Sequence, residues 1–121
     1  MGKLELFQKN VDRLRAAIPE LRGVLLASTE GLPIAHSISN GADANRVAAM
    51  AAAASSLGRR VSDSLSAGSL EEITVSATEG QIFLYSAGDK CVLAVLGPAG
   101  CNAGLVHLEA RSVAKELSEL F

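Results

Sequence analysis

The sequence contains no tryptophan, and aromatic residues of all kinds make up only 3% of its 121 positions. Proteins that bind single-stranded nucleic acid without sequence preference stack its bases on aromatic side chains. The chain also lacks a basic block: 11 Lys and Arg stand against 13 Asp and Glu, and the longest basic run is Arg59–Arg60. Nucleic acid and anionic membrane surfaces are therefore poor partners for this chain.

Cysteine is also scarce, and the chain has no long apolar segment. Cys91 and Cys101 do not form a disulfide framework, and no pair of histidines follows them to complete a zinc motif. The N-terminal residues have no apolar core of the kind found in signal peptides. Residues 91–108 lack Asp, Glu, Lys and Arg, but glycines and Pro98 interrupt them, which excludes a membrane-spanning helix. We expect a cytoplasmic protein with reduced thiols.

Residues that could support catalysis are scattered along the chain. Neither His36 nor His107 stands at a recognisable spacing from a nucleophile, and no GxSxG motif is present. The glycine-rich residues 97–104 lack the lysine of a phosphate-binding loop and the spacing of a dinucleotide fingerprint. Cys101 lies near a predicted helix start, which can lower the pKa of a thiol, so Cys101 is the candidate for a redox role. The pattern predicts no enzyme active site, no metal site and no cofactor.

Hydrophobic periodicity divides the chain into helices and strands. Apolar residues at steps of three and four predict a helix over 4–18, which Pro19 ends. A long helix follows over 44–65 with Asp43 as its N-cap, and a last helix begins after Asn102. The predicted strands cover residues 23–27, 32–37, 72–77, 81–86 and 91–96, and a loop over 39–43 leads into the long helix. The length and the absence of a linker predict a single domain over 1–121.

The composition of each strand predicts its place in the sheet. Strands 23–27 and 91–96 are continuously apolar, which is typical of strands buried on both faces at the centre. Pro33 cannot donate to a ladder and marks one edge, while the alternating strand 72–77 marks the other. Its opening carboxylates, Glu71 and Glu72, are expected to keep that edge soluble. The result is a three-layer α/β sandwich: a five-stranded, mainly antiparallel sheet with two helices on one face and the long helix on the other.

The long helix has two uncharged faces instead of one apolar stripe and a charged outer face. At 100° per residue, one face carries the larger apolar side chains and is expected to cover the sheet: Val47, Met50, Ala54, Leu57, Val61 and Leu65. The opposite face carries small residues that we expect to contact another molecule: Ala49, Ala52, Ala53 and Ser56. The alternative is that the alanines are only good helix formers and that this second face is solvated.

Three segments of the chain resemble the Roadblock family, which includes the dynein light-chain Roadblock proteins and bacterial and archaeal regulators of small Ras-like GTPases. The segments are LRGVLLASTEGLPIAHS (21–37), the alanine-rich helix, and FLYSAGDKCVLAVLGPAGCNAGLVHLEAR (83–111). The most specific features are the strand at Gly23 that leads to the turn at Glu30-Gly31-Leu32, and Leu96-Gly97 followed by Asn102, Gly104 and Leu105. The resemblance covers nearly the whole chain and implies the αββαβββα, Roadblock/profilin-like fold.

The resemblance further implies a homodimer in which the long helices pack together and the third strands pair across a two-fold axis. Family members are not enzymes; they bind, recruit or regulate small GTPases, in some cases as activating proteins or as components of exchange complexes. The expected dimer contact on this chain comprises Ala48, Ala49, Ala52, Ser55, Ser56 and Arg59 of the helix and Ile73, Thr74, Val75, Ser76 and Ala77 of the strand. A small-ligand sensor with a pocket between sheet and helix is the alternative function.

Overall fold

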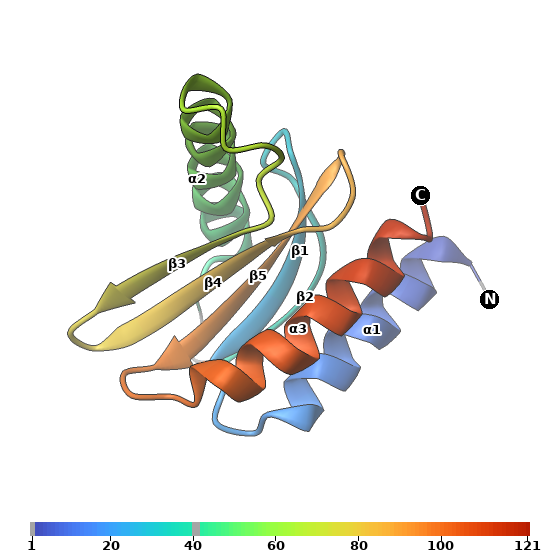
Figure 1. Cartoon of the computed structure of the whole chain (residues 1–121). Helices are drawn as coiled ribbons and strands as arrows, with labels where there is room; N and C mark the ends of the chain where they lie inside the picture. Colours follow the sequence, from blue (N-terminus) through green and yellow to red (C-terminus); the bar gives the residue numbers. More distant parts are fainter. Residues whose placement is uncertain (1, 40–41) are drawn as a thin grey trace.

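The computed structural model describes residues 2–39 and 42–121, and its elements follow the predicted order. They are α1 (Lys3–Ala17), β1 (Gly23–Ser28), β2 (Pro33–Ile38), α2 (Ala44–Ser64), β3 (Glu72–Ala77), β4 (Gly80–Ser86), β5 (Cys91–Pro98) and α3 (Ala103–Ser118). Figure 1 shows α1 and α3 side by side on one face of the sheet and α2 on the other. The three-layer sandwich is thus confirmed.

Local signals set the helix starts as expected. The Asp43 carboxylate accepts a hydrogen bond from the Asn45 amide at 2.9 Å and caps α2, and the Asn102 side chain accepts from the Leu105 amide at 3.1 Å and caps α3. Both caps satisfy amides that the first turn of a helix leaves without a partner. Of the loop predicted before α2, Asn40 and Gly41 lie outside the described residues.

The five strands form one antiparallel sheet in the order β2-β1-β5-β4-β3. The two continuously apolar strands, β1 and β5, lie at the centre, and the strand with Pro33 and the alternating strand lie at opposite edges, as predicted. The β1–β2 turn needs Gly31, whose φ of +94° lies in the region that side chains disfavour.

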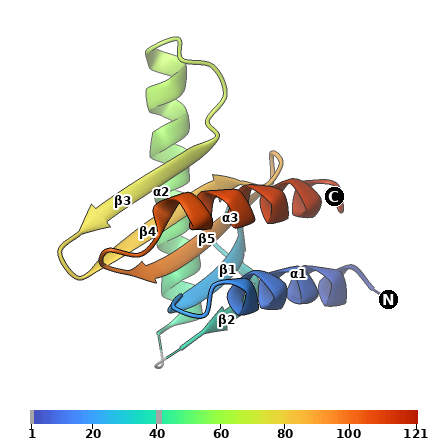
Figure 2. The same ribbon diagram turned by 60° about the horizontal axis from the view of Figure 1, so that its bottom comes forward.

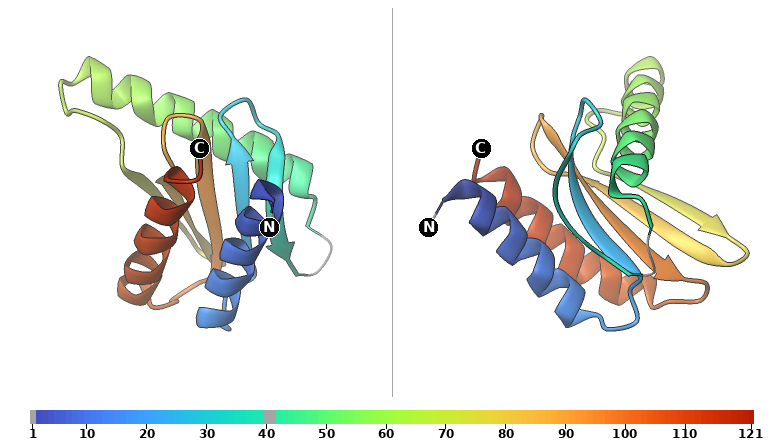
Figure 3. Two further views of the ribbon diagram at one scale, coloured as in Figure 1. Left: turned by 90° about the vertical axis from the view of Figure 1, so that its right-hand side faces the viewer. Right: turned by 180° about the vertical axis from the view of Figure 1, so that it is seen from behind.

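The two faces of the sheet are packed differently. Beneath α1 and α3 the core is made of large side chains, with Phe83, Leu93 and Leu117 fully buried. Beneath α2 the helix contributes short side chains such as Ala48 and Ala51 to two smaller clusters. Figure 3 shows the paired helices and the single helix on opposite sides of the sheet. The heavier packing under α1 and α3 makes that layer the main hydrophobic core.

The predicted orientation of α2 is only partly right: Val47 and Ala54 pack on the sheet and Ala49, Ala53 and Ser56 are exposed, as predicted, but Met50, Leu57, Val61 and Leu65 are exposed and Ala52 is buried. Its small residues face the sheet: Ala48 and Ala51 are almost inaccessible, whereas Met50 is 65% exposed and Leu57 57% exposed. Leucine, valine and alanine side chains of the sheet already fill much of the space under the helix, so only short side chains fit between the two layers. The rule that larger apolar residues face the protein's own core fails here because packing space, not hydrophobicity, decides the face.

Candidate interaction surface

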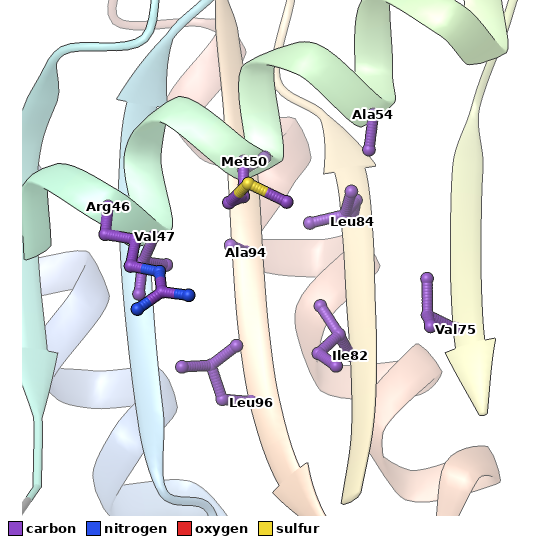
Figure 4. Close-up of a pocket in the computed structure, with 10 residues that line it drawn as sticks. Arg46, Val47, Met50, Ala54, Val75, Ile82, Leu84, Ala94 and Leu96 are labelled. Carbon is purple, nitrogen blue, oxygen red and sulfur yellow. The ribbon is translucent and has the colours of Figure 1, made fainter. Parts of the chain in front are cut away.

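An apolar groove of about 350 Å³ lies between α2 and the β3 side of the sheet. Its walls come from four elements: Val47, Met50, Ala51 and Ala54 of α2, Val75 of β3, Ile82 and Leu84 of β4, and Ala94 and Leu96 of β5, with Arg46 beside them. Figure 4 shows α2 crossing the strands obliquely, from β1 at Val47 to β4 at Ala54, so that the helix covers only part of the sheet. The sheet therefore keeps an uncovered apolar strip next to the helix.

The last turns of α2 carry a second apolar surface. Leu57, Val61 and Leu65 recur at steps of four, which places them on one side of a helix, and between 50% and 74% of each is exposed. We call these three residues the α2 stripe. Met50 stands on the same side of α2 about two turns earlier and lines the groove. Figure 2 shows this end of α2 extending past the sheet before the chain turns back into β3. Large apolar residues gathered in this way are typical of an interaction surface.

The outer edge of β3 is open: in the described part of the chain, no strand pairs with it. The Ser86 amide donates to the Glu71 carbonyl at 2.9 Å, and antiparallel hydrogen bonds recur at every second residue. The backbone groups of Glu72, Thr74 and Ser76 therefore point away from β4. An exposed row of backbone donors and acceptors is a template for a further strand.

The opposite edge of the sheet is closed by side chains of α1. The Gln8 amide group donates to the His36 carbonyl at 2.9 Å and accepts from the His36 amide at 3.3 Å, as a neighbouring strand would. Arg15 donates to the Ser37 carbonyl at 2.8 Å, and Pro33 has no N–H to offer. The two edges thus differ: β2 is blocked and β3 is available for pairing.

The structure separates the residues predicted for the dimer contact into two groups. Ala48, Ala52 and Ser55 are buried within the chain's own fold, so their side chains are not available to a second molecule and the contact proposed below does not use them. Accessible to solvent, at least in part, are Ala49, Ser56 and Arg59 of α2 and Ile73, Thr74, Val75, Ser76 and Ala77 of β3. The outward position of the α2 stripe could not be predicted from helical periodicity, although its spacing of four residues is visible in the sequence.

Glu72 is not a free solubilising charge, as the sequence suggested, but the centre of a polar cluster on the α3 side of the sheet. Arg111 holds its carboxylate with two hydrogen bonds, Nε to Oε2 at 2.9 Å and Nη2 to Oε1 at 2.5 Å. The hydrogen bonds from Arg111 lower the pKa of Glu72. His107 Nδ1 lies 3.9 Å from the same carboxylate and 2.8 Å from the Tyr85 hydroxyl. Pairs so distant in sequence leave no pattern that could predict them.

The thiols are buried. Cys91 lies in the central strand β5, as predicted, and desolvation raises its pKa to about 11. Cys101 contacts Gln81, since its Sγ lies 3.1 Å from the side-chain oxygen Oε1 of Gln81, and burial together with Glu20 raises the pKa of Cys101. The lowered pKa considered for Cys101 is therefore wrong, because the effect of lost solvation on the thiolate outweighs any stabilisation by the helix N-terminus.

Metal ligands and membrane spans are also expected to be absent. In residues 2–39 and 42–121, no three His, Cys, Asp or Glu side chains come together as metal ligands. No helix in these residues is long and apolar enough to cross a membrane.

Comparison with known proteins identifies the fold and the family. An uncharacterized protein of Methanocaldococcus jannaschii, MJ1340, is 29% identical over 101 residues, which cover 84% of this chain and 88% of that protein. Myxococcus xanthus MglB superposes with a TM-score of 0.90 at 17% identity, over 100% of this chain and 91% of that one. A Roadblock/LC7 domain from Streptomyces avermitilis gives a TM-score of 0.85 at 23% identity, over 93% and 94%. The sequence model of the Roadblock/LC7 domain matches residues 7–97, and the chain therefore belongs to the Roadblock/LC7 family.

Proposed function

We propose that this chain is a non-enzymatic homodimer that binds and regulates a small Ras-like GTPase. The observation that carries the homodimer is the position of the open β3 edge directly beside the apolar groove. A single partner can satisfy the backbone groups of the edge and cover the groove at the same time. A second copy of the chain supplies both, because it brings an identical edge and an exposed apolar stripe.

The pairing of the two edges follows from the direction of their backbone groups. An antiparallel pair of β3 strands around a two-fold axis must join residues whose backbone groups point outward, and these are Glu72, Thr74 and Ser76. The register with the largest overlap places Thr74 opposite Thr74 of the other copy, and Glu72 opposite Ser76. Ile73 and Val75, which lie on the α2 side of the sheet, then stand opposite each other across the axis and extend the apolar surface.

The α2 stripe completes this arrangement. Gly58 lies against Ile73 at the start of β3, since a Cβ on Gly58 would come within 2.7 Å of the Ile73 Cδ1 atom. The helix continues to Ser64, a further length of about 9 Å, which is close to two strand spacings. Beyond the β3 edge it would therefore lie above the other copy's β3 and β4. Leu57, Val61 and Leu65 of each copy would then fill the groove of the other.

The GTPase is proposed from family membership, since Roadblock proteins are regulators of small GTPases. The described residues fit a binding role: the titratable side chains that gather at Glu72 are joined to one another, and the cleft of about 240 Å³ that Glu72, Tyr85 and Arg111 line is open to solvent. The dimer offers a continuous sheet and a pair of α2 helices, which together make a broad surface for a protein partner. Regulation through binding needs no catalytic group on this chain.

Sedimentation velocity tests the homodimer. We expect a species of twice the 12.5 kDa chain mass at micromolar concentration. A monomer at that concentration would contradict the proposal.

For the GTPase, the immobilised chain is incubated with cell extract that contains either a non-hydrolysable GTP analogue or GDP, and bound proteins are identified by mass spectrometry. We expect to capture a Ras-like protein in a nucleotide-dependent manner. The purified Ras-like protein should bind the chain, and the chain should change that protein's rate of GTP hydrolysis or nucleotide exchange.

The small-ligand alternative uses the same groove. Its apolar walls, with Arg46 at the side, would suit a small apolar acid. Thermal unfolding of the wild-type chain in the presence of fatty acids of increasing length distinguishes the two functions. A rise of several degrees that saturates with ligand would favour the sensor, whereas the homodimer predicts no such rise because the groove is already filled.

A further inference from the structure

The open edge strand contains one charged residue. β3 reads Glu-Ile-Thr-Val-Ser-Ala, and Glu72 is its only ionisable side chain. Charges on edge strands are a common device that prevents one sheet from pairing with another. An unneutralised carboxylate at this position would have to lose solvent when a second strand arrives, which is costly. A strand that pairs with its own copy therefore needs a positive group that neutralises this carboxylate.

Arg111 of α3 provides that neutralisation from behind the strand. Its guanidinium binds both carboxylate oxygens of Glu72, and only 26% of the Glu72 side chain remains exposed. A bidentate pair of this kind fixes the direction of the carboxylate as well as its charge. His107 stands 3.9 Å from the carboxylate on the same side. The side chain is thus drawn towards α3, while the backbone groups of Glu72 stay available at the edge.

We propose that Arg111 is a positioning residue for the self-association of the chain: by holding and neutralising the Glu72 carboxylate, it makes the β3 edge competent to pair with a second copy. This inference rests on the homodimer proposed above. Because the two-fold axis repeats each residue, the dimer contains two such pairs, one at each end of the paired strands. Each Glu72 faces Ser76 of the other copy, which offers no positive charge, so Arg111 of the same chain must supply it.

Four variants test the role of Arg111, with the dimer dissociation constant measured by sedimentation and thermal unfolding followed alongside. Arg111→Met keeps an apolar stem but frees the carboxylate, and we expect the dissociation constant to rise about tenfold, with each of the two symmetric sites contributing about threefold. Glu72→Gln should stay close to wild type. The double variant Arg111→Met with Glu72→Gln should recover most of the affinity, because no charge is left to neutralise.

Arg13→Met is the matched control, because Arg13 makes a similar exposed ion pair with Glu116 at 2.6 Å between α1 and α3, away from β3. It should leave the dissociation constant unchanged. Hydrogen exchange at the Thr74 and Ser76 amides gives a second measurement, with faster exchange expected only in Arg111→Met. An unchanged dissociation constant in Arg111→Met, or a double variant as weak as Arg111→Met alone, would overturn the inference and leave the homodimer standing. A wild-type monomer would instead overturn the homodimer itself.

Discussion

Individual side chains in this molecule take their chemistry from the surroundings that the fold gives them. Cys91 lies in the central strand, and burial raises its pKa to about 11, so that the thiolate fraction at pH 8 falls about a hundredfold below that of an ordinary thiol. Cys101 is also buried, with a raised pKa. We expect iodoacetamide to alkylate neither thiol appreciably at pH 8 in the native protein and both after unfolding, as measured by mass spectrometry. Fast native labelling at Cys101 would contradict its burial.

Glu72 makes stability depend on acidic pH. Arg111 lowers the pKa of Glu72 below its ordinary value of 4.5, so the native state prefers the ionised carboxylate. The pair therefore stabilises the fold above about pH 4.5, and this contribution is lost as pH falls through the lowered pKa. Urea unfolding should show wild type more stable than Glu72→Gln by less than about 1 kcal/mol at pH 6, because the pair is partly exposed. The two proteins should converge towards pH 3, and a gap that widens there would be inconsistent with this sign.

Among the elements, α2 has three distinct sides. Short residues face the sheet, the stripe and Met50 face the β3 side, and Ser56 lies on the side away from the stripe. Leu57 and Ser56 are neighbours in sequence and both are exposed, which makes them a matched pair for testing which side of the helix meets the second copy. Both residues lie in the same helix, so a glutamate at either position should have a similar effect on the stability of the monomer.

We expect Leu57→Glu to give a folded monomer and Ser56→Glu to remain a dimer. A carboxylate in the groove of the other copy would be buried without a partner, which raises the dissociation constant by at least about a hundredfold. Light scattering after size exclusion measures the mass, and circular dichroism checks the fold. Dissociation by Ser56→Glu with a dimeric Leu57→Glu would support the sequence-based interface and contradict the α2 stripe.

At the scale of the whole molecule, the sheet has one blocked edge and one open edge, and this asymmetry would limit association by strand pairing to two copies. Thr74→Pro tests the open edge directly. Proline removes the outward N–H of Thr74 without touching the hydrogen bonds of β3 to β4, since edge strands tolerate proline where the N–H faces outward. We expect a folded monomer by sedimentation, with Thr74→Ala still dimeric. A dimeric Thr74→Pro would mean that the helices associate without strand pairing.

The layout of the fold could be read from the sequence because its signals are local. Continuous apolar runs marked β1 and β5 as central, Pro33 marked one edge, and side-chain caps marked the starts of α2 and α3. Each of these follows from the conformational and hydrogen-bonding needs of a few neighbouring residues. The location of an interaction surface at α2 and β3 also came from such patterns, and the paired copy that we propose for it remains a prediction.

The details of the surface depended on the tertiary structure. Helical periodicity showed that α2 has two uncharged sides, but the space left by the sheet decided that Ala48, Ala51 and Ala52 face inward and that Leu57 and Val61 face outward. The Arg111–Glu72 pair joins residues 39 apart, and the contact that closes β2 joins Gln8 to His36 across 28 residues. Sequence alone therefore determined the order of the elements and the two edges of the sheet, because these follow from residues that are neighbours in the chain. Only the folded chain decided which side of α2 faces outward and which side chain neutralises Glu72, because packing volume and long-range pairing exist only there.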